Sequence, residues 1–346
     1  MEAEHLDAFL VSHLPNIFYL TGFSGSNAAL LISFSQAILF TDTRYRFQAK
    51  CETPDAQIRI VNGSAMEGAA VTLRSGRALR VGFESSRVTV AQKDAFAHAC
   101  RKAVHWLAWD GRIEAERMMK DPGELATMRQ ASAIACSAWK AALPLTKPGV
   151  LECELAAEIE YRMHQMGADG CSFETIVASG KRSAWPHARA SRKPIEKNEL
   201  VVFDLGAILR GYSSDLTRTV HVGRASARVR GWYKAVLEAQ KAAQEAAQPG
   251  VNAENIDSAA RGVIRRAGFG REFIHSTGHG LGLEVHEMPR LGRGEKTLIR
   301  ENMVVTIEPG VYFEGQGGIR IEDDVRINRS GAEFITNASR ELIEIG

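Results

Sequence analysis

Four carboxylates and one histidine in the second half of the chain are the residues best suited to chemistry. They are Asp204, Asp215, His279, Glu308 and Glu322. Each lies in a short segment, such as VVFDLG or VVTIEPG, whose pattern is typical of a buried or half-buried strand. A carboxylate in such a strand is costly unless a cation neutralises it. Together the five residues predict a site built around metal ions.

The composition of this set also indicates which ions it would hold. Four carboxylates can supply the charge that two divalent ions need and can bridge them, and one imidazole completes one coordination sphere. Paired ions of this kind activate water at neutral pH. Oxygen-rich ligation favours Mn²⁺, and the imidazole leaves Co²⁺ or Zn²⁺ open. No cysteine lies near the set in the sequence, which argues against a structural zinc site.

Each member of the set has a structural alternative when it is taken alone. Asp215 could form an ion pair with Arg218, and Glu322 could do so with Arg320 or Arg326. The first aspartate of the set could be an ordinary turn residue. These alternatives concern single residues, whereas the metal hypothesis accounts for all five at once.

An internal repeat strengthens the metal hypothesis. The four-residue sequence KPGV (147–150) precedes one predicted helix, and the similar sequence QPGV (248–251) precedes another. The two prolines are 101 residues apart, and so are Gly167 and Gly268, which follow the two helices. Strands that carry the candidate ligands come next in both cases. This pattern predicts two structurally similar halves.

The candidate ligands follow the same repeat. Asp204 and Glu308 are 104 residues apart, and Asp215 and Glu322 are 107 apart. If the halves pack face to face, the four carboxylates meet between them. His279 then adds a fifth ligand from the second half alone.

The elements that precede these halves predict a separate, smaller α/β domain. We expect a boundary in the charged stretch 109–122, which ends in the turn signal Asp-Pro-Gly, with domains at 1–115 and 116–346. A long helix over 122–143 should open the second domain. The expected N-terminal strands are 9–15, 28–34, 36–42 and 78–85, and the expected helices are 43–50 and 90–101.

Composition excludes several classes of function. Of the 346 residues, 45% are hydrophobic and 24% charged, the net charge is +2, and basic residues are dispersed. A nucleic-acid partner is therefore not expected. The most apolar stretch, 28–40, is too short to span a bilayer, and the N-terminus has no signal pattern. Five cysteines without a C-x-x-C motif favour a reducing, cytoplasmic setting.

Several motifs in order along the chain resemble one known superfamily. They are DLGA (204–207), GYSSDLTRT (211–219), TGHGLGLEVHEMP (277–289), IEPGVY (307–312) and GIRIEDDV (318–325). The chain is similar to the creatinase/methionine-aminopeptidase superfamily, and within it to the proline-peptidase branch of family M24B. Stretches 16–32, 38–49 and 172–191 also resemble the family. The resemblance therefore covers nearly the whole chain.

The resemblance implies an α+β fold in which a smaller α/β N-terminal domain precedes a pita-bread catalytic domain of two pseudo-symmetric halves. It implies that Asp204 and Asp215 bind one metal ion and that His279 and Glu308 bind the other. Asp215 and Glu322 would bridge the two ions.

The resemblance also implies roles around the metal ions. His187 would contact the scissile-bond region, His286 would assist proton transfer, and Glu308 would carry the proton from the attacking water. The residues implied to line the substrate site are His275, Arg320, Tyr312 and Trp185. Trp185 stands where relatives more often have a smaller aliphatic residue. It could form part of the substrate wall, but a packing role is the reading we favour from sequence.

The expected function is a dinuclear-metal Xaa-Pro aminopeptidase that hydrolyses peptides with proline in second position through a hydroxide bridging the ions. The alternative is an Xaa-Pro dipeptidase. A creatinase-like enzyme or a non-catalytic binding protein on the same fold fits less well, because all five ligands are present. Methionine aminopeptidases lack the extra N-terminal domain. Family habit implies a homodimer or a higher homo-oligomer.

Overall fold

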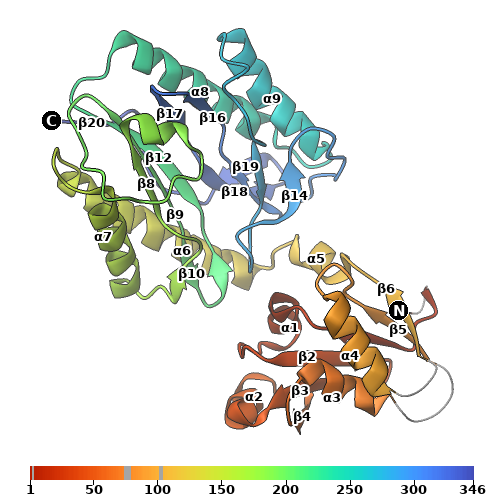
Figure 1. Ribbon diagram of the computed structural model, residues 1–346. Helices are drawn as coiled ribbons and strands as arrows, with labels where there is room; N and C mark the ends of the chain where they lie inside the picture. Colours follow the sequence, from red (N-terminus) through yellow and green to blue (C-terminus); the bar gives the residue numbers. More distant parts are fainter. Residues whose placement is uncertain (2–3, 74–78, 101–103) are drawn as a thin grey trace. The chain divides into compact units, whose positions relative to one another are not determined.

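The computed structural model describes residues 1, 4–73, 79–100 and 104–346. These residues form two compact units, Met1–Arg117 and Met118–Gly346 (Figure 1). Within the described part of the chain, no helix combines the length and the apolar character needed to cross a membrane.

The first unit is built around one mixed sheet with strand order β4-β3-β2-β1-β5-β6. Its strands are β1 (Ala8–Val11), β2 (Ala28–Ser33), β3 (Ala37–Asp42), β4 (Gln57–Val61), β5 (Leu79–Phe83) and β6 (Val104–Ala108). Its helices are α1 (Leu14–Thr21), α2 (Arg46–Glu52), α3 (Ala65–Thr72), α4 (Val90–Cys100) and α5 (Arg112–Arg117). Alternate strand residues face opposite sides. Helices α3 and α4 therefore cover one face, and α1 and α2 cover the other.

The predicted N-terminal elements are found with shifted bounds. The strand expected at 9–15 ends at Val11, because Pro15 lies in the first turn of α1, where a proline suits the start of a helix. The helix expected at 43–50 is a 3-10 turn (Thr43–Tyr45) followed by α2. Residues 78 and 101, at one end of a predicted strand and a predicted helix, lie outside the described residues.

The first half of the second unit begins with a well-capped helix. The Asp121 side chain accepts a hydrogen bond from the Glu124 amide at 2.8 Å, and Glu124 accepts one from the Asp121 amide at 2.7 Å. This capping box, with Pro122 in the first turn, fixes where the helix starts. The elements of this half are α6 (Pro122–Ala142), α7 (Glu152–Gln165), β7 (Gly170–Cys171), β8 (Ile176–Ser179), β9 (Leu200–Leu205), β10 (Ala207–Leu209), β11 (Tyr212–Ser213) and β12 (Leu216–Val222), with 3-10 turns at Leu143–Leu145 and Gly180–Ala184.

The second half repeats this order. Its elements are α8 (Ala227–Ala246), α9 (Ala253–Arg266), β13 (Gly278–Gly280), β14 (Glu287–Leu291), β15 (Val304–Ile307), β16 (Gly310–Phe313), β17 (Gly317–Arg320), β18 (Asp323–Asn328) and β19 (Gly331–Phe334). The strand that follows, β20 (Glu344–Ile345), returns to the first half and pairs with β12. Sheet β20-β12-β9-β8 in the first half corresponds to sheet β14-β13-β15-β18-β19 in the second. Helices α6 and α7 pack on the former, and α8 and α9 pack on the latter (Figure 1).

Backbone conformation marks the repeat. Gly149 and Gly250 precede the second helix of each half with φ of 94° and 88°, and Gly167 and Gly268 follow it with φ of 94° and 89°. Residues other than glycine rarely adopt this left-handed conformation. The glycines noticed in the sequence therefore serve the same turn in each half, and the predicted fold of two matched α/β halves is confirmed.

Candidate metal centre

The four carboxylates stand at corresponding ends of two antiparallel hairpins. In the first half, Asp204 lies near the end of β9 and Asp215 immediately precedes β12, which pairs with β9. In the second half, Glu308 immediately follows β15 and Glu322 immediately precedes β18, which pairs with β15. Each hairpin therefore presents two acids at one end, as the repeat predicted.

The two hairpins meet so that these acids converge on the histidine. Asp215, His279 and Glu322 each offer a ligand atom within 4.8 Å of the others. His279 Nε2 lies 3.5 Å from Glu308 Oε1 and 3.8 Å from Asp215 Oδ2. Asp204 lies close to these acids. Its charge adds to the effect of burial in raising the pKa of Asp215 and of Glu322. All five predicted ligands are thus brought together.

A glycine allows the histidine to reach this position. Gly278 precedes His279 on β13, and a Cβ atom at Gly278 would lie 2.0 Å from the carbonyl oxygen of Thr306. Any larger residue would push β13 away from the chain segment that leads to Glu308. The His279 amide also donates to Thr306 Oγ1 at 3.1 Å, which fixes the backbone of β13 there.

The electrostatics of the cluster favour a bound cation. Burial, followed by the charges of neighbouring carboxylates, raises the pKa of Asp215 and of Glu322 well above the ordinary range. Burial raises the pKa of Glu308 to about 7, although Arg320 opposes this shift. Asp215 Oδ1 is buried and has no hydrogen-bond partner among the described residues. A divalent ion would neutralise the repulsion and supply the missing partner.

His279 is in the form that binds metal. Burial lowers its pKa to about 4, so the ring is neutral at pH 7. Nδ1 lies 3.0 Å from the carbonyl oxygen of Gly280, which can only accept, so Nδ1 carries the proton. Nε2 then presents its lone pair toward Glu308 and Asp215. The residues present therefore fit a divalent cation.

Arg320 and Thr217 hold two of the acids in place. Arg320 Nη2 donates to Asp204 Oδ2 at 2.5 Å, and Arg320 Nε donates to Thr217 Oγ1 at 3.0 Å. The same hydroxyl donates to Glu322 Oε2 at 2.6 Å. One threonine thus links an acid from the second half to the arginine that orients an acid from the first half.

We expect Thr217→Val to weaken metal binding by roughly 10- to 100-fold, the usual effect of losing a residue that orients a ligand. Valine preserves the volume but leaves Glu322 Oε2 without its donor. Isothermal titration with Mn²⁺ measures the change. The matched control is Thr219→Val, because among the described residues the Thr219 hydroxyl forms hydrogen bonds only with the backbone of Arg320. Equal losses in both variants would contradict the proposed role of Thr217.

The remaining predicted histidines lie around the cluster. The His286 ring packs edge-on against His279, with centroids 4.4 Å apart. His275 Nε2 lies 2.9 Å from the hydroxyl of Tyr312, which accepts a hydrogen bond from Arg320 Nη1 at 2.7 Å. His187 is exposed. Burial is the main cause of the lowered pKa of His275 and of His286, and the electrostatic interaction of each ring with His187 adds to it, so His187 lies near both.

The exposure of Trp185 corrects one sequence interpretation. Its side chain is 58% exposed, so the packing role that we favoured is wrong. The guanidinium of Arg182 lies over the indole ring, 5.1 Å from its centroid. Trp185 is therefore a surface residue two positions before His187, and its part in the substrate wall stays a prediction.

The structural alternatives for single residues are also wrong. Arg218 pairs with Asp323 at 2.6 Å rather than with Asp215. Arg320 reaches across to Asp204, and Arg326 donates to Asn302 Oδ1 at 2.7 Å.

Sequence reasoning missed two residues of this site. Asp324 accepts a hydrogen bond from the Asp215 amide at 3.1 Å, and burial raises its pKa well above the ordinary range. The other is Thr217, whose hydroxyl links Arg320 to Glu322. Each lies two residues after a predicted ligand, Glu322 and Asp215. Strand periodicity places such residues on the same face, and that signal was available in the sequence.

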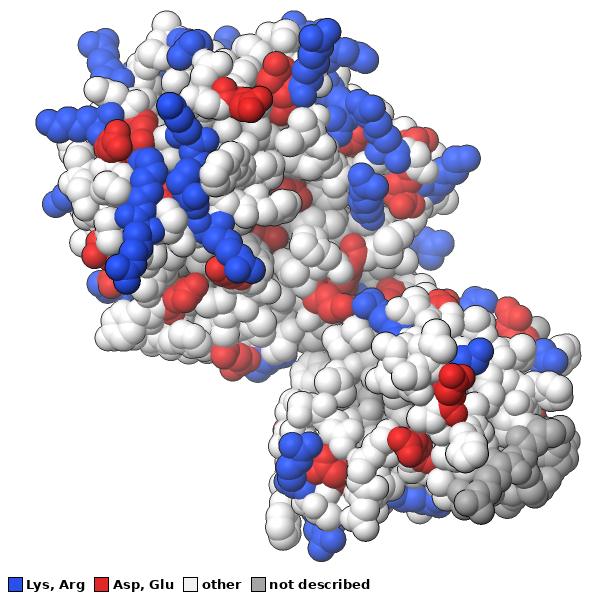
Figure 2. All heavy atoms as spheres, viewed as in Figure 1, with Lys and Arg blue, Asp and Glu red and all other residues white. Residues whose placement is uncertain are grey.

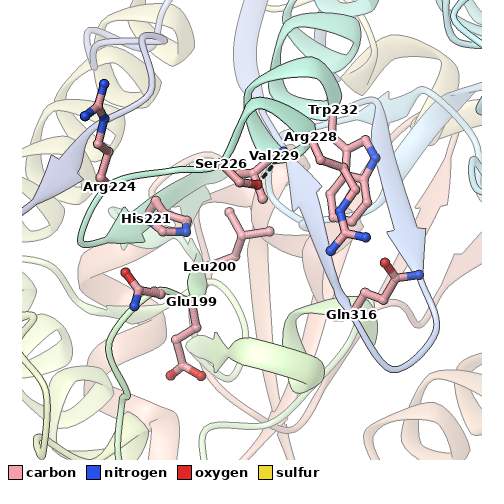
Figure 3. Close-up of a pocket in the computed structure, with 10 residues that line it drawn as sticks. Glu199, Leu200, His221, Arg224, Ser226, Arg228, Val229, Trp232 and Gln316 are labelled. Atoms are coloured by element: carbon pink, nitrogen blue, oxygen red, sulfur yellow. Dashed lines mark hydrogen bonds between the residues drawn. The ribbon is translucent and has the colours of Figure 1, made fainter.

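A pocket of about 340 Å³ lies elsewhere in the same unit and is not this site. Figure 3 shows its lining, which includes His221, Ser226, Arg228 and Trp232. His221 pairs with Leu200 in the β9–β12 ladder, at the opposite end from Asp204 and Asp215. None of the predicted site residues lines this pocket.

On the face drawn in Figure 2, basic and acidic side chains are interspersed.

Known protein families match both units of the chain. Residues 126–329 match the model described as metallopeptidase family M24, and residues 1–119 match the creatinase/prolidase N-terminal domain. The chain is 39% identical to an Xaa-Pro dipeptidase of Pyrococcus horikoshii, over 99% of this chain and 96% of that protein.

Solved structures give the same assignment. An Xaa-Pro dipeptidase from Bacillus anthracis superposes with a TM-score of 0.95 at 36% identity, covering 99% of this chain and 96% of that one. An X-Pro aminopeptidase from Thermotoga maritima gives a TM-score of 0.90 at 38% identity, covering 98% of each chain. The predicted family and enzyme class are confirmed. The chain therefore belongs to metallopeptidase family M24, whose members are hydrolases, and carries the creatinase/prolidase N-terminal domain.

Proposed function

We propose that this protein is a metal-dependent Xaa-Pro dipeptidase, which hydrolyses the bond before the proline of a dipeptide. The observation that supports the proposal is the similarity to Xaa-Pro dipeptidases along nearly the entire chain, combined with the convergence of the five candidate ligand residues. The names of these relatives favour the dipeptidase alternative over the aminopeptidase that we placed first from sequence.

We propose that two divalent ions, preferably Mn²⁺, are held by the predicted residues. Asp204 and Asp215 would bind one ion, and His279 and Glu308 would bind the other. Asp215 and Glu322 would each bind both ions. Oxygen ligands dominate this set, which favours Mn²⁺ over softer metals. When bound, the ions would polarise the scissile carbonyl and lower the pKa of the attacking water.

The side chains of the site would move protons and hold the substrate. Glu308 would accept the proton of the attacking water and pass it to the proline nitrogen, since its Oε1 lies 3.5 Å from Nε2 of the candidate ligand His279. His286 would assist this transfer, and exposed His187 would contact the carbonyl of the scissile bond. When the scissile C–N bond breaks, its electron pair goes to the proline nitrogen, so a proton must be delivered to that nitrogen as it leaves.

The linked side chains His275, Tyr312 and Arg320 would bound the proline side of the substrate. Burial lowers the pKa of His275 to about 4, so this ring is neutral at pH 7 and offers an apolar surface next to the tyrosine. Trp185 would form an outer part of the wall. We also propose that residues 1–115 and 116–346 act as an accessory and a catalytic domain.

The second candidate function is an Xaa-Pro aminopeptidase, which would accept longer peptides. The superposition on the aminopeptidase of Thermotoga maritima favours it. Both functions use the same ligands and differ only in whether the site admits residues beyond the proline.

The expected result with Mn²⁺ is a higher kcat/KM for an Xaa-Pro dipeptide than for the Xaa-Pro-Yaa tripeptide. Xaa-Ala, which lacks the methylenes that close the proline ring, should be cleaved at least about tenfold more slowly. Product release followed by chromatography measures all three. A tripeptide preference would replace the dipeptidase with the aminopeptidase, and equal cleavage of Xaa-Ala would overturn proline specificity.

A further inference from the structure

One buried carboxylate ties down both ends of the segment that carries Trp185 and His187. Glu152, the first residue of α7, is 0% exposed. One oxygen accepts hydrogen bonds from the amide and hydroxyl of Ser179 at 2.7 and 2.8 Å. The other accepts from the amide and hydroxyl of Ser191 at 3.1 and 2.6 Å. Residues 179 and 191 are the two ends of this segment, which we call the histidine loop.

The same carboxylate also reaches the tip of the histidine loop. Arg182 Nε donates to Glu152 Oε2 at 3.0 Å, and Arg182 Nη2 donates to the carbonyl of Arg189. The guanidinium lies over the Trp185 ring. A chain of contacts thus runs from Glu152 through Arg182 to Trp185.

The loop is also fixed to the strand that carries Arg320. The Gly318 amide on β17 donates to Ser183 Oγ at 2.9 Å. A Cβ atom at Gly318 would lie 2.4 Å from the Ser183 carbonyl oxygen, so only glycine permits this approach. The position of the loop is therefore defined relative to the metal centre.

The second half contains a matching arrangement. Asp257 on α9 is 1% exposed and accepts from the amide and hydroxyl of Thr277 at 3.2 and 2.9 Å. It also binds Arg261, whose Nη2 donates to the His275 carbonyl at 2.7 Å. In each half, a buried acid on the second helix and an arginine hold the segment that carries a site histidine.

We propose that Glu152 is a positioning residue that holds Trp185 and His187 at the substrate site. Its charge strengthens each hydrogen bond that it accepts, and the start of a helix favours that charge. A residue of this kind acts through geometry, because small displacements of a substrate-contacting group reduce the rate strongly. The expected consequence for activity depends on the proposed dipeptidase function, whereas the effect on Trp185 does not.

The test replaces Glu152 with glutamine, which keeps the shape and removes the charge. We expect Glu152→Gln to lower kcat/KM for an Xaa-Pro dipeptide roughly 10- to 100-fold, with unchanged Mn²⁺ stoichiometry. The fluorescence anisotropy of Trp185, taken as the difference from the same variant with Trp185→Phe, should fall. The matched control is Glu158→Gln on the same helix. In the described part of the chain, the partially exposed Glu158 carboxylate pairs only with Arg162, at 2.7 Å, so this change should have no effect.

The outcomes separate this inference from the proposed function. If the wild-type protein cleaves no Xaa-Pro dipeptide, the dipeptidase proposal fails, and the anisotropy of Trp185 still tests Glu152. Unchanged anisotropy in Glu152→Gln, or loss of bound Mn²⁺, would overturn the positioning role. If Glu152→Gln does not fold, Arg182→Met tests the same contact while leaving the serine contacts intact. Lower Trp185 anisotropy in that variant supports the inference, and wild-type anisotropy overturns it.

Discussion

Replacing Asp215 with asparagine is expected to reduce hydrolysis of an Xaa-Pro dipeptide by about a thousandfold or more, since several kcal/mol of transition-state stabilisation depend on the metal ions. The same change is expected to raise the thermal stability of the metal-free protein. Burial and the charges of Glu322, Asp204 and other acids raise the pKa of Asp215, so its charge is unfavourable without a cation. Asparagine removes that charge at nearly constant volume.

Two measurements check this prediction: steady-state kinetics with Mn²⁺ and the unfolding temperature after chelation. The control is Asp169→Asn, which makes the same chemical change at an exposed position of the same unit. An Asp215→Asn variant that loses activity and is also less stable without metal would indicate a structural role instead. The expected combination, a loss of activity with a gain in stability, is typical of residues kept for function.

Divalent ions are expected to stabilise the catalytic unit strongly at neutral pH and much less in acid. At 100 times the dissociation constant, binding adds about 2.7 kcal/mol. For a unit of this size, that corresponds to an increase of roughly 5–10 °C in unfolding temperature. Calorimetry with and without Mn²⁺ measures the shift, and the two compact units should be fitted as separate transitions.

The pH dependence follows from the acids of the cluster. The pKa of Glu308 rises from 4.5 to about 7 on folding, so its contribution to stability is fully present below pH 4.5 and is lost as the pH rises to about 7. This loss is on the order of 3 kcal/mol in the metal-free protein. Added Mn²⁺ should reverse it at pH 7.5 and change little at pH 4.5. A metal-independent unfolding temperature at pH 7.5 would contradict a metal centre at these residues.

Pairing partners show where sequence reasoning fails and why. Asp215 and Arg218 are close in sequence, but their odd spacing on a strand places their side chains on opposite faces. Arg218 therefore meets Asp323, which comes from the other half of the domain. Arg320 likewise bonds Asp204, 116 residues away. Ion pairs form between side chains that folding brings together, and local spacing does not reveal them.

The candidate ligands could be predicted from the sequence because each is a polar or charged residue in a segment typical of a buried strand. An acid in an apolar strand is visible without any structure, and the repeat of 101 residues pairs the acids between halves. Glu152 and Asp257 gave no such signal, because acids near the start of amphipathic helices are common. Only their burial beneath the histidine-bearing segments distinguishes them.

The amino-acid sequence by itself thus indicated the two matched halves and the five candidate ligand residues, since the repeat, the glycine positions and acids in apolar segments are visible in residue order, and its ordered motifs indicated the family. Only the tertiary structure decided which side chains hold those ligands and that Trp185 is exposed. It also decided that one carboxylate on α7 anchors the histidine loop. These features depend on contacts between segments that lie dozens of residues apart, some within one half and some between the two halves, and only folding brings those segments together.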